Sequence, residues 1–118
     1  MNLITKILAI LVALESLYIM YIETIITTSE KTSKVFGIPT DILQDKTVST
    51  LLKNQGIYNG LIGVLILITV LVFASKVATI SLLIYVILVA TYGGITSNPK
   101  IILMQGGLAI LALISTIF

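Results

Sequence analysis

The chain has 118 residues, of which 58% are hydrophobic and only 10% are charged, and its formal net charge is +2. A soluble domain keeps roughly a quarter of its residues charged, so this composition indicates that lipid is the main solvent. Because cysteine and histidine are absent, disulfides, thiol nucleophiles and the usual zinc and haem ligands are excluded. We therefore expect no cofactor and no metal, and the small, dispersed charge argues against a nucleic-acid partner.

Four tracts with little or no charge predict four membrane-spanning helices, because a helix needs about 20 residues to cross the hydrocarbon core. A single helix over residues 57–97 would be about 60 Å long, roughly twice the core thickness, so we expect a turn at residues 75–76. Asn-Pro-Lys at residues 98–100 marks the last turn. The expected fold is an all-α integral membrane protein, a single antiparallel four-helix bundle with spans at residues 4–26, 57–75, 77–95 and 101–118.

The first tract begins like a secretory signal, with Lys6 before an apolar run. However, Glu15 interrupts that run and the apolar character continues to Ile26, so we interpret the tract as a retained span. Its large aliphatic side chains favour insertion by roughly 3 to 7 kcal/mol. That gain offsets the cost of about 3 kcal/mol for a carboxyl at mid-membrane.

The long connection at residues 27–56 is expected to be partly helical. The first helix is expected to continue past the membrane without a break and to end at Gly37. Thr40 or Asp41 is the expected N-cap of a second, amphipathic helix. The sequence NQGIYNG at residues 54–60 is then expected to form the turn at which the chain returns into the membrane.

The distribution of lysines predicts the orientation in the cell membrane. The side of the long loop has the larger number of lysines, with Lys6 and Lys76 on the other side and Lys31, Lys34, Lys46, Lys53 and Lys100 on the loop side. Positive charge accumulates on the cytoplasmic side, so we expect a cytoplasmic loop and both termini outside. Membrane lipids are the expected partners, and the glycine-rich helix faces are typical of proteins that pair into homo-oligomers.

Most of the unusual polar residues fall near one leaflet when the spans alternate in direction. They are Glu23, Asn54, Gln55, Tyr58, Asn59, Tyr92 and Gln105. Glu15 lies deeper, about 12 Å from Glu23 along the first helix axis, and Tyr18 lies between these two carboxyls. We expect all nine residues to line one inward-facing polar pocket.

Glu15 is the strongest candidate for a functional group, because an ionisable residue at mid-membrane is costly unless it binds, pairs or carries a proton. The chain has no arginine, and no lysine lies deep within a span. Exclusion of water disfavours the charged form, so a protonated Glu15 is the expected resting state. A structural interpretation stays open, in which the protonated acid donates to Ser16 or to a neighbouring helix.

The glycines also have a structural interpretation. Gly56 and Gly60 form a small-xxx-small pair, which lets helices approach each other closely in lipid. We assign helix packing to this pair and to the later ones, Gly93, Gly94, Gly106 and Gly107. Under the same interpretation the amide side chains hydrogen-bond between helices and bind nothing else.

Several motifs resemble those of one family. They are ESLYIMYIET at 15–24, KVFGI at 34–38, NQGIYNG at 54–60, YGGIT at 92–96 and QGGLAILAL at 105–113. The family they resemble is a set of small bacterial integral membrane proteins known as domain of unknown function 1304. The resemblance covers essentially the whole chain and implies the membrane fold, but it implies no activity.

Two hypotheses of function follow. The first is a membrane protein whose polar pocket binds or transports a small solute, in which Glu15 exchanges its proton for a cationic, lipophilic molecule. The second is a structural or partner-binding membrane protein whose polar and glycine residues serve helix packing. We do not expect an enzyme, because no histidine, cysteine or serine–base arrangement supports a reaction.

Overall fold

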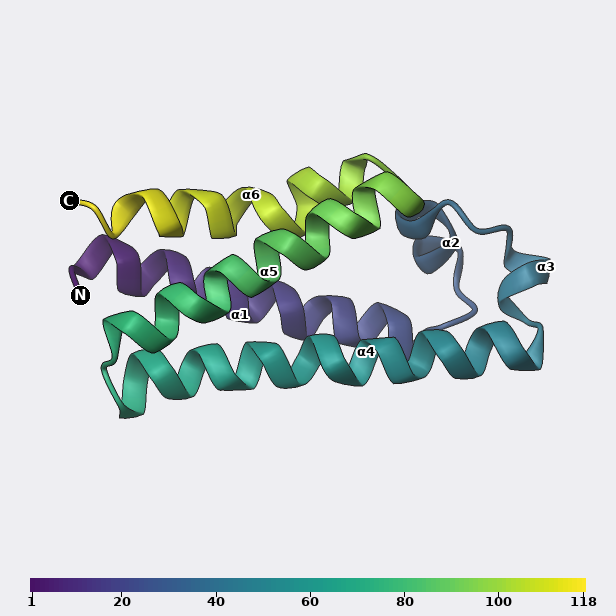
Figure 1. The fold of residues 1–118 in the computed structure, drawn as a ribbon. Coiled ribbons are helices and arrows are strands. Elements are labelled where there is room, and N and C mark those ends of the chain that lie inside the picture. The colour runs from purple at the N-terminus through teal and green to yellow at the C-terminus, as the bar shows by residue number, and fades with distance from the viewer.

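The computed structural model describes residues 1–118 as an all-helical chain without strands. The long helices lie side by side and alternate in direction, so both termini lie at one end and the short helices at the other (Figure 1). The expected all-α fold is confirmed. In chain order the elements are α1 (Leu3–Met20), the π-helix η1 (Tyr21–Ile25), α2 (Glu30–Phe36), α3 (Thr40–Leu43), α4 (Lys46–Leu67), the π-helix η2 (Ile68–Val72), α5 (Lys76–Thr96) and α6 (Lys100–Ser115).

Three helical segments are long and apolar enough to cross a membrane. They are Leu3–Ile25, Lys46–Val72 and Lys76–Thr96. The remaining long helix, α6, is also apolar but has only 16 residues. The helices turn at residues 73–75, where Ala74 has a positive φ of 46°, and at residues 97–99. Both turns lie where the sequence predicted them.

The connection between α1 and α4 differs from the expectation in two ways. The first helix ends at Ile25, and a separate helix, α2, begins after its N-cap Ser29, so the continuous helix predicted to Gly37 is wrong. Gly37 nevertheless ends α2, in the left-handed conformation with φ 68°. The predicted N-cap at Thr40 or Asp41 is also wrong, because both residues lie within α3. Asp45 caps α4 instead and accepts a hydrogen bond from the backbone N–H of Val48 at 3.1 Å.

The predicted turn at residues 54–60 is wrong. Helix α4 begins at Lys46, well before the expected span, and runs without a break through NQGIYNG. The two glycines of this sequence do not interrupt the helix because both are buried against the first helix. Their role is close packing, which offsets the cost of about 1 kcal/mol per glycine in a helix.

Helix α1 lies at the centre of the arrangement and packs against α4 on one side and α6 on the other, and α5 packs on α6. In contrast, α4 and α5 touch mainly near their shared turn and diverge toward the loop end (Figure 1). The main core fills the half of the bundle near the termini, and it consists of Ala9, Val12, Ala13, Ile66, Val70, Leu83, Val86, Ala109 and Ala112. A smaller core lies under the loop and consists of Ile19, Ile22, Phe36 and Ile101.

Glycines bring the backbone of α4 close to α1. A Cβ atom at Gly60 would overlap the sulfur of Met20, and one at Gly63 would lie 2.7 Å from the backbone oxygen of Ala13. Since a backbone atom cannot move aside as the tip of a side chain can, Gly63 is the position that tolerates a side chain least. Gly63 was not among the glycines singled out from the sequence.

The glycines between α5 and α6 pack less uniformly. A Cβ atom at Gly94 would overlap Cγ1 of Ile102, and one at Gly106 would lie 3.4 Å from Cβ of Ala90. At Gly107 a Cβ atom would have no neighbour within 4 Å. Packing within this chain therefore does not require a glycine at position 107.

We predict that Gly63→Ala destabilises the protein, because overpacking a close contact costs about 1 to 3 kcal/mol. Gly107→Ala is the matched control, and it should keep or raise the free energy of unfolding, since alanine favours a helix by up to about 1 kcal/mol over glycine. The measurement is denaturant unfolding in detergent micelles followed by circular dichroism. Equal stabilities of the two variants would contradict the packing described for α1 and α4.

Candidate functional site

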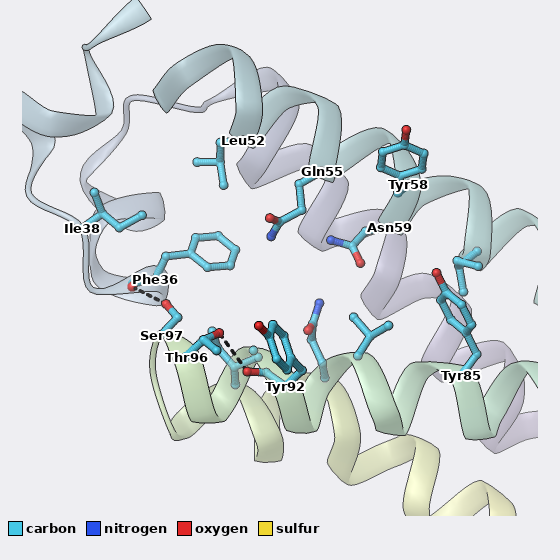
Figure 2. Close-up of a pocket in the computed structure, with 15 residues that line it drawn as sticks. Phe36, Ile38, Leu52, Gln55, Tyr58, Asn59, Tyr85, Tyr92, Thr96 and Ser97 are labelled. Atoms are coloured by element: carbon cyan, nitrogen blue, oxygen red, sulfur yellow. Dashed lines mark hydrogen bonds between the residues drawn. The ribbon is translucent and has the colours of Figure 1, made fainter. Parts of the chain in front are cut away.

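A cavity of about 340 Å³ lies near the loop end of the bundle, where α4 and α5 diverge (Figure 2). Its polar lining comes mainly from α4, α5 and α6 and includes Gln55, Tyr58, Asn59, Tyr85, Tyr92 and Gln105. Its apolar lining includes Phe36, Ile38, Leu52, Ile62, Val89 and Ile101. None of the residues that line the cavity is charged.

Glu23 lies behind the wall of this cavity and has no exposed surface. Its Oε2 accepts a hydrogen bond from Nε2 of Gln55 at 2.7 Å, and its Oε1 accepts one from Nδ2 of Asn59 at 2.6 Å. Both partners are neutral amides one turn apart on α4. An ionised carboxyl is an acceptor only, so this geometry satisfies a carboxylate without any cation.

The Glu23 carboxylate fixes the orientation of both amides. Because the NH₂ groups of Gln55 and Asn59 face Glu23, their carbonyl oxygens face away from it and accept no hydrogen bond within the chain. Both side chains project into the cavity (Figure 2). The amide oxygens of Gln55 and Asn59 are therefore free acceptors at the cavity wall. Glu23, which orients them, does not itself line the cavity.

The local structure around Glu23 explains its position. Glu23 lies in the π-helix η1, an irregularity that is frequent at functional sites. The Thr32 hydroxyl donates to the backbone oxygen of Ile22 at 2.6 Å, and the Thr27 hydroxyl donates to that of Glu23 at 2.7 Å. On the facing helix, a Cβ atom at Gly56 would lie 2.9 Å from Cβ of Glu23. The absence of a side chain at Gly56 thus lets α4 cover the carboxyl.

Glu15 lies beside a second, much smaller cavity. This inner cavity has a volume of about 20 Å³, room for about one water molecule. Its polar lining consists of Glu15, Ser16, Asn59 and Gln105. It shares five lining residues with the larger cavity, namely Asn59, Ile62, Tyr85, Val89 and Gln105. Glu15 is half-buried and lies behind the larger cavity, whose lining it does not join.

Three tyrosines surround the cavity (Figure 2). Tyr58 on α4 and Tyr92 on α5 are 72% and 70% exposed, and Tyr85 on α5 is 51% exposed. Tyr85 was not among the expected site residues. Tyr85 lies seven residues before Tyr92, which places both on one face of the helix. This spacing could have identified Tyr85 as a site residue from the sequence. Gly93 also lines the cavity, although it was assigned to helix packing.

Four of the nine residues expected in the pocket do not line the larger cavity, because Glu23 lies behind its wall, Glu15 lines only the inner cavity, and Asn54 and Tyr18 line neither. Asn54 is exposed and lines neither cavity. Tyr18 lies on an exposed face of α1, where Nζ of Lys31 is 5.0 Å from the centre of its ring. Such a cation–π contact is worth about 0.5 to 1 kcal/mol at an exposed site, so Tyr18 connects α1 to α2.

The loop closes one end of the cavity. Phe36 and Ile38, at the end of α2 and just beyond it, line this end. The turn between α5 and α6 holds them in place, because the Ser97 hydroxyl donates to the backbone oxygen of Phe36 at 3.3 Å and Nδ2 of Asn98 donates to that of Val35 at 3.2 Å. These hydrogen bonds join residues more than 60 positions apart, and no local pattern predicts them.

Comparisons with known proteins agree with the resemblance found in the motifs. The model of a family described as "Protein of unknown function (DUF1304)" matches residues 10–117. The "Uncharacterized protein YpaA" of Lactococcus lactis subsp. lactis (strain IL1403) is 55% identical over 119 residues, covering all of both chains. No solved structure matches. The chain belongs to the DUF1304 family, whose function is unknown.

Proposed function

We propose that this protein crosses the cell membrane four times and binds a small cationic solute in the cavity between α4 and α5. The observation that carries the proposal is the buried Glu23, whose hydrogen bonds turn the amide oxygens of Gln55 and Asn59 toward the cavity. No cationic side chain lines this cavity.

The exposed surface supports membrane insertion. Large apolar side chains are exposed along all four long helices, and the surface of α6 alone exposes Leu103, Ile110, Leu111 and Ile114. Soluble proteins rarely expose apolar patches of this extent. The longest dimension of the protein, 46 Å, is close to the full thickness of a bilayer, about 40 to 45 Å. Helix α6 is about 24 Å long, so a fourth span at this helix requires slight local thinning of the bilayer.

The chemistry of the cavity favours a cation that can donate hydrogen bonds. The amide oxygens of Gln55 and Asn59 are free acceptors, and tyrosine rings attract cations through their faces. Two carboxyls, Glu15 and Glu23, lie behind the lining, and no lysine lies in it. A primary ammonium group fits these features, whereas an anion would find hydroxyl and amide donors in the lining but no positive charge.

Glu15 is the proposed site of proton exchange. It lines the inner cavity, which shares Asn59 and Gln105 with the larger one. A cation that approaches a carboxyl favours its charged form, so binding in the larger cavity would promote release of a proton from Glu15. One water molecule in the inner cavity would connect the two sites.

The second candidate function is structural. It is favoured by the close glycine contacts between α4 and α1 and by the fact that the Glu23 hydrogen bonds themselves join these two helices. Under this alternative the amide oxygens bind nothing and the cavity is filled by lipid.

We predict that the protein in lipid nanodiscs binds benzylammonium and that Asn59→Leu weakens this binding about 10- to 100-fold, because a hydrogen bond to a charged group contributes about 1.5 to 3 kcal/mol. Asn54→Leu is the matched control, since it changes the same residue type on the same helix outside the cavity. Isothermal titration calorimetry measures both. If the wild type binds no benzylammonium, or if the two variants bind it equally, the structural alternative is the better account.

We predict the orientation of the loop from its lysines. The absence of cysteine allows single cysteines to be introduced without a background. In intact bacterial cells, Lys34→Cys should be protected from a membrane-impermeant maleimide, and Phe118→Cys should be labelled. The reverse pattern would place the loop outside the cell, and labelling of both cysteines would contradict an odd number of spans between the loop and the C-terminus.

A further inference from the structure

The cavity opens outward between α4 and α5, where exposed tyrosines border it. Tyr58 borders it on α4, and Tyr85 and Tyr92 border it on α5, all of them largely exposed (Figure 2). The two helices diverge from their turn at residues 73–75 toward the loop end (Figure 1). In the proposed four-span arrangement, a gap between two lipid-facing helices opens to the bilayer.

Other parts of the chain cover much of the rest of the cavity. Ile101 and Gln105 of α6 form part of the lining, and Glu23 of the first helix lies directly behind the amides. Phe36 and Ile38 cover the loop end, and Phe36 is only 8% exposed. The hydrogen bonds of Ser97 and Asn98 hold this cover on the bundle. A solute that comes from water on the loop side therefore meets Phe36 and Ile38, with the exposed Thr96 and Ser97 beside them.

The lining combines polar and apolar groups. The free amide oxygens lie at the inner wall, where Glu23 holds Gln55 and Asn59. Ile62 and Val89, on the two helices that border the opening, provide an apolar lining. The volume of about 340 Å³ is at the small end of the range for ligand sites, about 300 to 1,000 Å³. At about 30 Å³ per heavy atom, the cavity holds roughly eleven heavy atoms, so the end of a longer ligand must extend out through the opening.

We infer that the solute is an alkylammonium amphiphile that reaches the cavity from the bilayer, between α4 and α5. This inference rests on the proposed function. The ammonium group donates to the amide oxygens held by Glu23, and the alkyl chain passes Ile62 and Val89 into the lipid. The absence of lysine from the lining excludes the phosphate head groups of ordinary phospholipids as the preferred occupant, because nothing would neutralise them.

The experiment compares ethyl-, butyl-, octyl- and dodecylammonium, which share one head group, in nanodiscs with wild-type protein, with Asn59→Leu and with no protein. After correction for partition into empty nanodiscs, dodecylammonium should bind at least ten times more tightly than ethylammonium, and Asn59→Leu should weaken both. Val89→Trp narrows the opening and should reduce dodecylammonium binding at least tenfold. Ile42→Trp, in α3 at the loop end and outside the lining of both cavities, should leave it within twofold.

The outcomes separate the two proposals. If no ammonium ion binds in a way that depends on Asn59, the proposed function itself fails. If all four bind equally after the correction, or if Ile42→Trp weakens binding as much as Val89→Trp does, the cation site stands and access from the bilayer is wrong. If Val89→Trp converts a cross-linkable dimer into a monomer, a second copy of the chain occupies the opening and the inference is overturned.

A second readout covers the case in which Val89→Trp does not fold. The chain contains no tryptophan, so Tyr92→Trp gives a single fluorescent probe at the edge of the opening. Brominated acyl chains should quench its fluorescence, and dodecylammonium should relieve that quenching at least twofold more than ethylammonium does. Quenching by aqueous iodide in place of brominated lipid would show that the opening faces water and would overturn the inference.

Discussion

The hydrogen bonds of Glu23 are the constraint on which the rest of the site depends. A carboxyl without exposed surface must be fully satisfied, since an uncompensated buried charge costs several kcal/mol. Gln55 and Asn59 satisfy it, and in doing so they fix the register of α4 against the first helix. The same two hydrogen bonds determine which atoms of the amides face the cavity. One buried side chain thus sets both a helix contact and the polarity of a cavity that it does not line.

Around that contact, the fold is arranged asymmetrically. At the end near the termini, small residues let the helices pack closely, and hydroxyl pairs such as Thr5 with Ser115 (2.7 Å) and Thr69 with Thr79 (3.1 Å) connect them. At the loop end, α4 and α5 separate and the cavity lies between them. No buried side-chain nitrogen or oxygen in the chain lacks a hydrogen-bond partner. At the cavity, the amide oxygens of Gln55 and Asn59 accept no hydrogen bond within the chain and so are available to a ligand.

Hydropathy and turn residues were sufficient to predict the long helices and the turns at residues 73–75 and 97–99, because these signals are local. These local signals did not predict which of the two carboxyls, Glu15 or Glu23, is the more buried. Glu15 was the stronger candidate from its depth along the helix, whereas the structure buries Glu23 completely. The complete burial of Glu23 arises from its place in the π-helix and from the absence of a side chain at Gly56, which lets the facing helix cover it. No glycine or proline marks the π-helix in the sequence. Thr32, whose hydroxyl donates to the backbone oxygen of Ile22 in this π-helix, lies ten residues further along the chain.

The most direct test of the account is the NMR signal of the side-chain amides of Gln55 and Asn59 in ¹⁵N-labelled protein, recorded with and without a primary ammonium ion. The account predicts that Glu23→Gln moves both amide signals and that the ammonium ion moves the same two signals in the wild type. Amide signals that respond to Glu23→Gln but to no ammonium ion would contradict it. In that case the Glu23 contact would serve only to hold α4 against the first helix.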